Sequence, residues 1–308
     1  MQILLALGGL SETKRLVPIT SAHVSGASYK MIGDPGLEFL EDFARDARVA
    51  VPTTVNPLGT DLAQWKELGI PPDFAEKQAR IARAYATMGV RPSFSCTPYL
   101  IGVRPGLGEH VAWAESNAVC FANSVLGART NREGGPSALA ASIVGATPED
   151  GLHTDEGRKP TIVVHVTTKP RGLDFSLIGL VAGERVGEGL PYFRGFRGTE
   201  EDLKWFGAAL ASSGSCGMFH LDGVTPEARR ASTRGRSTRR SSRSTAGLSR
   251  NTAPASSTRS RSMPAPATAS SSRTRAVAQA IPRSGDGRSA AGRAATAARA
   301  GARSTTRT

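Results

Sequence analysis

The sequence has only three cysteines, Cys96, Cys120 and Cys216, and they lie far apart. Such a set is too small for a disulfide framework, so we expect a reducing compartment, the cytoplasm. There is no apolar run of roughly 18 residues, and we therefore expect no membrane span. The apolar start "MQILLALGGL" lacks the basic residues and the cleavage site of a signal peptide. We interpret it as the remainder of a helix whose beginning is absent.

Lysine, phenylalanine, tryptophan and tyrosine are all missing from residues 227–308. Of the 39 basic residues of the whole chain this segment holds 18, and these 18 are all Arg. Of the 26 acidic residues of the whole chain it holds only two. Residues 1–226 therefore keep 21 basic and 24 acidic residues and are mildly acidic. A segment made of Arg, Ser, Thr, Ala, Gly and Pro cannot bury enough apolar surface to offset its conformational entropy. We expect residues 229–308 to form a disordered basic tail.

Two explanations of this tail remain open. A basic arm of this kind would bind nucleic acid through its charge, without sequence specificity. The same six residue types are also what GC-rich codons give when they are read in the wrong frame. The missing lysines and aromatic residues and the abrupt junction near Glu227 favour a frame error or an unselected extension.

The remainder, residues 1–228, alternates strand-like and helix-like segments. The strand-like segments are "RLVPITSA", "RVAVPTTV", "RPSFSCT", "TIVVHVT" and "CGMFHLDGV". The helix-like segments are "PGLEFLEDFARDA", "DLAQWKELG", "DFAEKQARIARAYATMG", "ESNAVCFANSVLG", "PSALAASIVG" and "TEEDLKWFGAALASSG". Asp73 with Glu76, and Thr199 with Asp202, have the spacing of N-terminal capping pairs. The alternation predicts an α/β fold with a mainly parallel sheet layered with helices.

A polar cluster stands between two helix-like segments in "CFANSVLGARTNREGGPSALAASIVG". Residues 129–132, Arg-Thr-Asn-Arg, exceed what a turn needs to set its backbone angles. We expect Arg129 or Arg132 to neutralise a phosphate or carboxylate, since the guanidinium fork meets an oxyanion with two hydrogen bonds. The alternative is structural: an ion pair of Arg129 or Arg132 with Glu115 or Glu133 would lock the two helices together.

Several long blocks of the sequence resemble the catalytic, or large, subunit of the aconitase X family. The resemblance covers nearly all of residues 12–228. It is carried by "RLVPITSAHVSGASYKMIGDPGLEFLEDFA", "ARVAVPTTVNPLGTD", "SCTPYL", "GEHVAWAESNAVCFANSVLGARTNREGGPSALAASIVG" and "SCGMFHLDGVTPEA".

The resemblance implies an iron–sulfur hydro-lyase, an enzyme that removes water from a β-hydroxy acid. One substrate class of the family is mevalonate 5-phosphate, an intermediate of the mevalonate pathway, and the other is cis-3-hydroxy-L-proline. The blocks "NPLGTD", "CTPYL" and "TNREGGPSAL" look more like the phosphomevalonate type. The remaining alternative is a non-catalytic α/β protein whose basic arm binds nucleic acid.

The resemblance also implies a [4Fe-4S]-type cluster with Cys96 as one ligand. A cluster iron with an open position can act as the Lewis acid for the leaving hydroxyl. Cys120 and Cys216 are expected to be structural. The other two cluster ligands of the family belong to a C-terminal half that should follow "GVTPEA", where the basic tail stands instead. We therefore expect the chain to be truncated at both ends and not to hold the complete cluster.

By the same resemblance, five residues contact the substrate: Gly26, Ala27, Ser28, Asn56 and Pro57. His23 is a candidate catalytic base, although a histidine in this setting can equally bond a neighbouring backbone group. The family takes its proton-abstracting serine from a small subunit with a swivelling domain, and no segment here resembles that domain. A small-subunit partner is therefore implied, together with a small-molecule substrate.

Overall fold

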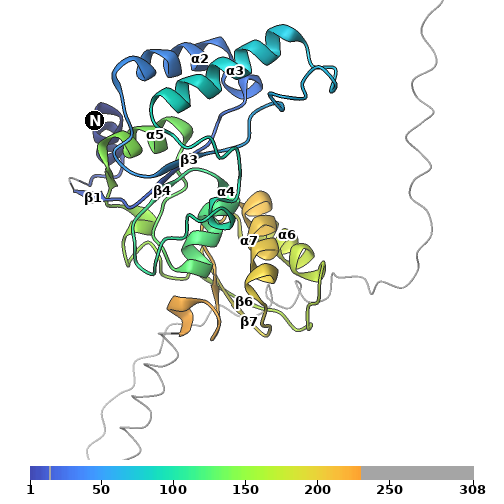
Figure 1. Ribbon diagram of the computed structural model, residues 1–308. Helices are drawn as coiled ribbons and strands as arrows, with labels where there is room; N and C mark the ends of the chain where they lie inside the picture. Colours follow the sequence, from blue (N-terminus) through green and yellow to red (C-terminus); the bar gives the residue numbers. More distant parts are fainter. Residues whose placement is uncertain (14, 230–308) are drawn as a thin grey trace, which may run out of the picture.

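The computed structural model of the protein describes residues 1–13 and 15–229 (Figure 1). The predicted basic tail lies outside the described residues. The chain begins with α1 (Gln2–Leu10), which confirms that the apolar start is helical. Next, β1 (Leu16–Pro18) pairs antiparallel with β5 (Ala146–Pro148) and forms a small two-stranded sheet.

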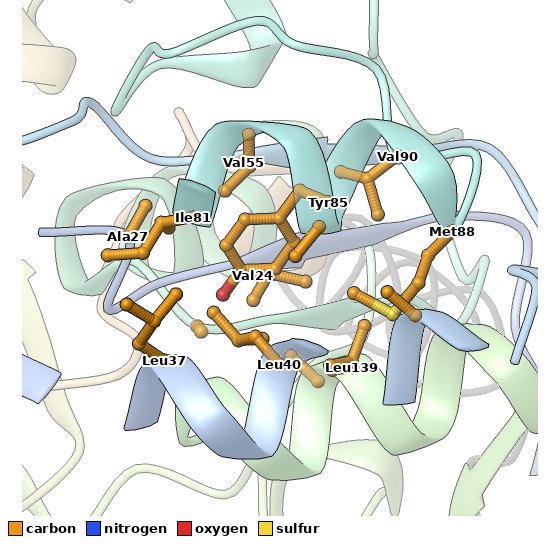
Figure 2. Close-up of a cluster of buried hydrophobic side chains, with 14 residues drawn as sticks. Val24, Ala27, Leu37, Leu40, Val55, Ile81, Tyr85, Met88, Val90 and Leu139 are labelled. Carbon is orange, nitrogen blue, oxygen red and sulfur yellow. The ribbon is translucent and has the colours of Figure 1, made fainter. Parts of the chain in front are cut away.

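The first parallel sheet has the strand order β3-β2-β4. Its strands are β2 (Ala22–Val24), β3 (Thr53–Val55) and β4 (Ala112–Trp113). Three helices pack around it, α2 (Tyr29–Asp46), α3 (Pro72–Thr87) and α5 (Gly135–Val144). Figure 2 shows Val24 and Val55 of the strands among Leu40, Tyr85 and Leu139 of the helices. Burial of these apolar side chains stabilises the layer arrangement.

The second parallel sheet has the order β6-β7-β8. Its strands are β6 (Ile162–His165), β7 (Pro191–Arg194) and β8 (His220–Leu221). It packs with α6 (Asp174–Val186) and α7 (Glu200–Gly214) over a core in which Phe193, Phe206 and Phe219 are fully buried. The helix α4 (Ser116–Phe121), continued by the π-helical turn η2 (Ala122–Leu126), contacts α7 and joins the two layers. Two single 3₁₀ turns complete the elements, η1 (Pro98–Leu100) and η3 (Gly151–His153).

Some predicted elements are absent or differ. "DLAQWKELG" forms consecutive turns rather than a regular helix. The Asp61 carboxylate accepts the backbone N–H groups of Ala63 and Gln64, as a helix cap would, but the bonds that follow are irregular: the N–H of Gly69 goes to the carbonyl of Lys66, and that of Ile70 to the carbonyl of Trp65. "RPSFSCT" contributes only an isolated bridge, from Arg91 to Thr54. The predicted Asp73 cap was wrong: the N-cap of α3 is Pro71, two residues earlier, and the helix begins at Pro72, whose fixed φ suits the first helical turn.

The capping pair of Thr199 and Asp202 is confirmed at the start of α7. The strand-like segment "TIVVHVT" forms β6, although its apolar residues are not all buried: Ile162 and Val163 are each 43% exposed. It is an edge strand of its sheet, and edge strands have a neighbour on one side only. The elements β4, β5, β7 and α6 were missed, and the predicted strand "RLVPITSA" reaches only the first residue of β2. Among the described residues, no helix is long and apolar enough to cross a membrane.

Candidate functional site

A cavity of about 520 Å³ opens at the carboxyl ends of the first parallel sheet. Gly26 comes shortly after β2, Asn56 directly after β3, and Glu115 shortly after β4. Ligands of α/β proteins commonly bind at this edge of the sheet. The lining residues are Ser25, Gly26, Met31, Ile32, Gly36, Phe39, Leu40, Asn56, Tyr85, Ala114, Glu115, Ser116, Arg132, Glu133, Gly135, Pro136 and Leu139.

The wall of the cavity combines apolar and polar side chains. Phe39 and Leu40 of α2, Tyr85 of α3 and Leu139 of α5 are apolar members of the wall, and Leu40, Tyr85 and Leu139 are labelled in Figure 2. The polar side chains include Asn56, Glu115, Arg132 and Glu133, together with Ser25 and Ser116. A mainly apolar cavity with a few convergent polar groups is typical of a small-molecule site.

His23 and Asn56 belong to a hydrogen-bonded chain that reaches this cavity. His23 Nδ1 lies 2.8 Å from Thr54 Oγ1, and its Nε2 lies 2.7 Å from Asn56 Oδ1. Asn56 Nδ2 in turn donates to Glu115 Oε2 at 2.5 Å. Burial lowers the pKa of His23 to about 4, so the ring is neutral at neutral pH. The partners of His23 are two side chains, not the backbone group considered from the sequence.

Among the described residues, Glu133 is one of two carboxyl groups that line the cavity. Its oxygens accept hydrogen bonds from Ser137 Oγ at 2.5 Å and from Thr147 Oγ1 at 3.2 Å. Burial raises its pKa, against the opposing effect of these two hydroxyl groups. A carboxyl group in this position can hold a proton closer to neutral pH than a solvent-exposed glutamate can.

The two arginines of the polar cluster have different surroundings. Arg132 lines the cavity and is exposed, and within the described residues its side chain donates to the carbonyl of Ser215 at 3.3 Å. Arg129 is not part of the lining; it pairs with Asp155 and donates to the carbonyl of His153 at 2.8 Å. The structural alternative was wrong, because neither arginine pairs with Glu115 or Glu133 in the described part of the chain.

Of the five residues expected to contact substrate, Gly26 and Asn56 line the cavity. Gly26 has a φ of +79°, a backbone conformation that favours glycine. Ala27 is buried and its carbonyl accepts from Gln78, while Ser28 is the N-cap residue of α2. Pro57 is exposed and outside the lining. The substrate contacts of all five remain predictions.

The three cysteines differ in burial, and Cys120 and Cys216 have the structural setting that the sequence predicted. Cys96 is exposed and follows Ser95, whose backbone N–H donates to the carbonyl of Val55 at the end of β3. Cys120 and Cys216 are buried, which raises the pKa of both thiols, that of Cys216 to about 11. Among the described residues no three metal-binding side chains lie together. The described residues therefore do not fit a complete cluster, and Cys96 as one ligand stays a prediction.

Comparison with known proteins agrees with this architecture. The sequence model of the aconitase X first domain matches residues 1–156, and that of the aconitase X second domain matches residues 160–249. The chain belongs to the aconitase X family. The boundary between the two matches falls before β6, so each parallel sheet of this aconitase X chain corresponds to one family domain.

Three relatives indicate what the chain is similar to. It is 55% identical to a phosphomevalonate dehydratase large subunit of Methanothermobacter thermautotrophicus, over 74% of this chain and 57% of that protein. It is 42% identical to a cis-3-hydroxy-L-proline dehydratase of Pseudomonas aeruginosa, over 74% of this chain and 40% of that protein. The crystal structure of Thermococcus kodakaraensis aconitase X in the holo-form matches with a TM-score of 0.69 and 48% identity, and the match covers 74% of this chain and 57% of that one. The chain thus spans little more than half the length of the large subunits it matches.

Sequence reasoning considered Glu115 and Glu133 only as ion-pair partners and missed Ser116. A usable signal was present, because Glu115 and Ser116 follow the apolar "HVAWA" that forms β4. Recognition of that strand would have placed both residues at a strand end, beside Asn56.

Proposed function

We propose that this chain acts as the substrate-binding large subunit of a hydro-lyase, with mevalonate 5-phosphate as the substrate. The named relatives support this choice, since the phosphomevalonate dehydratase subunit is 55% identical and the hydroxyproline dehydratase 42%. The observation that carries the proposal is the cavity at the carboxyl ends of β2, β3 and β4, which combines an apolar wall with Arg132, Asn56 and two carboxyl groups.

Arg132 supplies the positive charge that an acidic substrate needs. Among the described residues it has no carboxylate partner, so its guanidinium is available to a phosphate or carboxylate in the cavity. An ionic hydrogen bond of this kind is worth about 1.5–3 kcal/mol. The site therefore favours a phosphorylated hydroxy acid over an uncharged molecule of similar size.

We assign the other polar groups of the cavity to the hydroxyl groups of the substrate and to the proton that is transferred. Asn56 and Ser116 can hold substrate oxygens, and Glu133 can hold a proton close to them. Loss of water also requires activation of the leaving hydroxyl, which the family accomplishes with an iron–sulfur cluster. The described residues offer one exposed thiol, that of Cys96, so no step is assigned here to the cluster.

A second chain is part of the proposal. The archaeal relatives are named large subunits, which implies a small-subunit partner. We assign the proton-abstracting serine to that partner, and turnover should therefore require both chains.

The test is calorimetric titration of the full chain with mevalonate 5-phosphate. Mevalonate, which lacks the phosphate, and cis-3-hydroxy-L-proline are the matched ligands. Saturable binding of mevalonate 5-phosphate with clearly weaker binding of the other two is expected. Tighter binding of cis-3-hydroxy-L-proline would replace the substrate by that of the related enzymes, and no binding of any of the three would contradict the proposal.

The alternative of a non-catalytic protein with a basic arm rests on the tail, which lies outside the described residues. It predicts salt-dependent binding of a DNA duplex that is lost when residues 229–308 are removed. Binding that also depends on the sequence of the duplex would favour this alternative. Weak binding without sequence preference is expected of any segment with this many arginines.

A further inference from the structure

His23 stands at the inner end of the hydrogen-bonded chain that reaches the cavity. Its side chain is fully buried, and His23 is paired with Thr54 across the parallel strands β2 and β3. The chain runs from Thr54 through His23 and Asn56 to Glu115, with separations of 2.8, 2.7 and 2.5 Å. Trp113 of β4 contacts the ring of His23 edge-on, at a centroid distance of 6.3 Å.

The carboxylate of Glu115 fixes the direction of every hydrogen bond in this chain. A carboxylate oxygen only accepts, so Asn56 must direct its Nδ2 toward Glu115 and its Oδ1 toward His23. The carbonyl oxygen Oδ1 also only accepts, which places the ring hydrogen of neutral His23 on Nε2. Nδ1 is then an acceptor, and the hydroxyl group of Thr54 donates to it.

We propose that His23 is a positioning residue that locks the side-chain amide of Asn56, so that Asn56 directs a free N–H group to a ligand in the cavity. Oδ1 accepts from the ring and one hydrogen of Nδ2 is held by Glu115, which leaves the second hydrogen of Nδ2 as a donor. The ligand group beside Asn56 is therefore a hydrogen-bond acceptor, such as a carboxylate or hydroxyl oxygen. This inference rests on the proposed function for the identity of that ligand.

The ring itself does not act on the ligand. Both nitrogens of His23 are engaged, the residue is fully buried, and it is not among the residues that line the cavity. A rotation of the Asn56 amide by 180° would bring Oδ1 against the Glu115 carboxylate and Nδ2 against the ring N–H. Both hydrogen bonds would be lost together, which is why the ring can hold the amide in one orientation.

The first experiment measures the tautomer of His23 and needs no ligand. The full chain is labelled with ¹⁵N-histidine, and His23→Gln identifies the His23 signals among the five histidines. At pH 7 we expect a neutral ring with its hydrogen on Nε2. A hydrogen on Nδ1, or a doubly protonated ring, would overturn the proposal, whatever the substrate is.

The second experiment compares variants by calorimetric titration with mevalonate 5-phosphate. His23→Gln keeps an N–H donor for Asn56, whereas His23→Met removes it. His220→Met is the matched control, because His220 is also a buried histidine, with Nε2 2.9 Å from the carbonyl of Arg158, but does not line the cavity. We expect affinity to fall roughly tenfold in His23→Met and to stay within about threefold of the parent in the other two variants.

An affinity of His23→Met equal to that of the parent, with a melting temperature that shows it folded, would overturn the proposal. If His23→Met does not fold, the tautomer of His23 measured in the unchanged chain tests the proposal instead. Absence of binding by the parent chain would contradict the proposed function, while the tautomer would still test the positioning of Asn56.

Discussion

Nδ1 of His110 lies 2.9 Å from Nδ1 of His153, and the two rings stack with an interplanar angle of 11°. Nε2 of His153 accepts the backbone N–H of Asn131 at 3.4 Å. The ring hydrogen of His153 therefore sits on Nδ1 and is donated to His110. Both rings are neutral in this arrangement, and Arg129 and Arg158 stand nearby.

This pair makes the fold sensitive to acid. Burial, and then the neighbouring charges, lower the pKa of His153 to about 3, and burial lowers that of His110. The unfolded chain, with histidine pKa values near 6.5, binds more protons, so stability is full above pH 6.5 and falls as the pH drops toward 3. At pH 5 we expect His153 alone to reduce the free energy of unfolding by roughly 2 kcal/mol relative to pH 7.5.

Urea unfolding of the full chain at the two pH values measures this loss. His153→Gln should shrink the difference between them. His165→Gln is the control, because His165 is exposed on β6, and it should leave the difference unchanged. A pH dependence that is the same in all three proteins would show that His153 is not a source of the acid sensitivity.

Arg132→Ala should weaken the binding of mevalonate 5-phosphate by about tenfold or more, because it removes an ionic partner worth about 1.5–3 kcal/mol. Arg91→Ala is a close control, since Arg91 is also exposed and also bonds only a backbone carbonyl, that of Ile101, but lies outside the cavity lining. Titration calorimetry in one buffer gives both affinities. Equal affinities in the two variants would exclude Arg132 as the anion-binding group.

Thr199→Ala should lower the free energy of unfolding by about 1 kcal/mol, since it deletes the side-chain cap of α7. Thr199 Oγ1 accepts the backbone N–H of Asp202 at 3.2 Å, and the Asp202 carboxylate accepts the N–H of Thr199 at 2.8 Å. Ser212→Ala in the same helix removes only a hydroxyl group that bonds the preceding turn, and should stay within about 0.5 kcal/mol. Chemical denaturation of the two variants side by side is the measurement.

Gly183→Ala should destabilise the contact between α6 and α7 by about 1–3 kcal/mol. A Cβ at Gly183 would lie 2.7 Å from the carbonyl oxygen of Leu210 and 2.9 Å from the backbone nitrogen of Gly214, and neither can rotate away. Gly9→Ala in α1 is the contrast, because nothing lies within 4 Å of its added Cβ. Thermal melts should show a loss for the first variant and none for the second.

Cys96 should be the reactive thiol of the folded chain. It is exposed, whereas burial raises the pKa of Cys120 and Cys216 and the Sγ of Cys216 donates to the carbonyl of Gly187 at 3.0 Å. Brief alkylation with iodoacetamide followed by peptide mass spectrometry should label Cys96 first. Equal labelling of all three cysteines in the native protein would contradict the burial of Cys120 and Cys216. Labelling of these two only after denaturation is the expected result.

Local sequence signals succeeded where a single residue sets a local structure. Thr199 with Asp202 marked the start of α7, and Gly127 and Gly145 end their helices with φ values of +75° and +76°. They failed at residues 61–69. Asp61 accepts two N–H groups there as a cap does, yet the backbone hydrogen bonds that follow do not repeat regularly, and the predicted helix forms only turns.

The sequence by itself determined the alternation of strands and helices, the membership of the aconitase X family, and the structural role of Cys120 and Cys216. These follow from periodicity, from composition and from long blocks of sequence that are readable along the chain. Only the tertiary structure decided that Arg132 lines the cavity while Arg129 pairs with Asp155, although the two are three residues apart. It also decided that His23, Asn56 and Glu115, from three different strands and their ends, form one hydrogen-bonded chain. Such relations depend on which strand ends meet across a parallel sheet, and no local pattern encodes that distance.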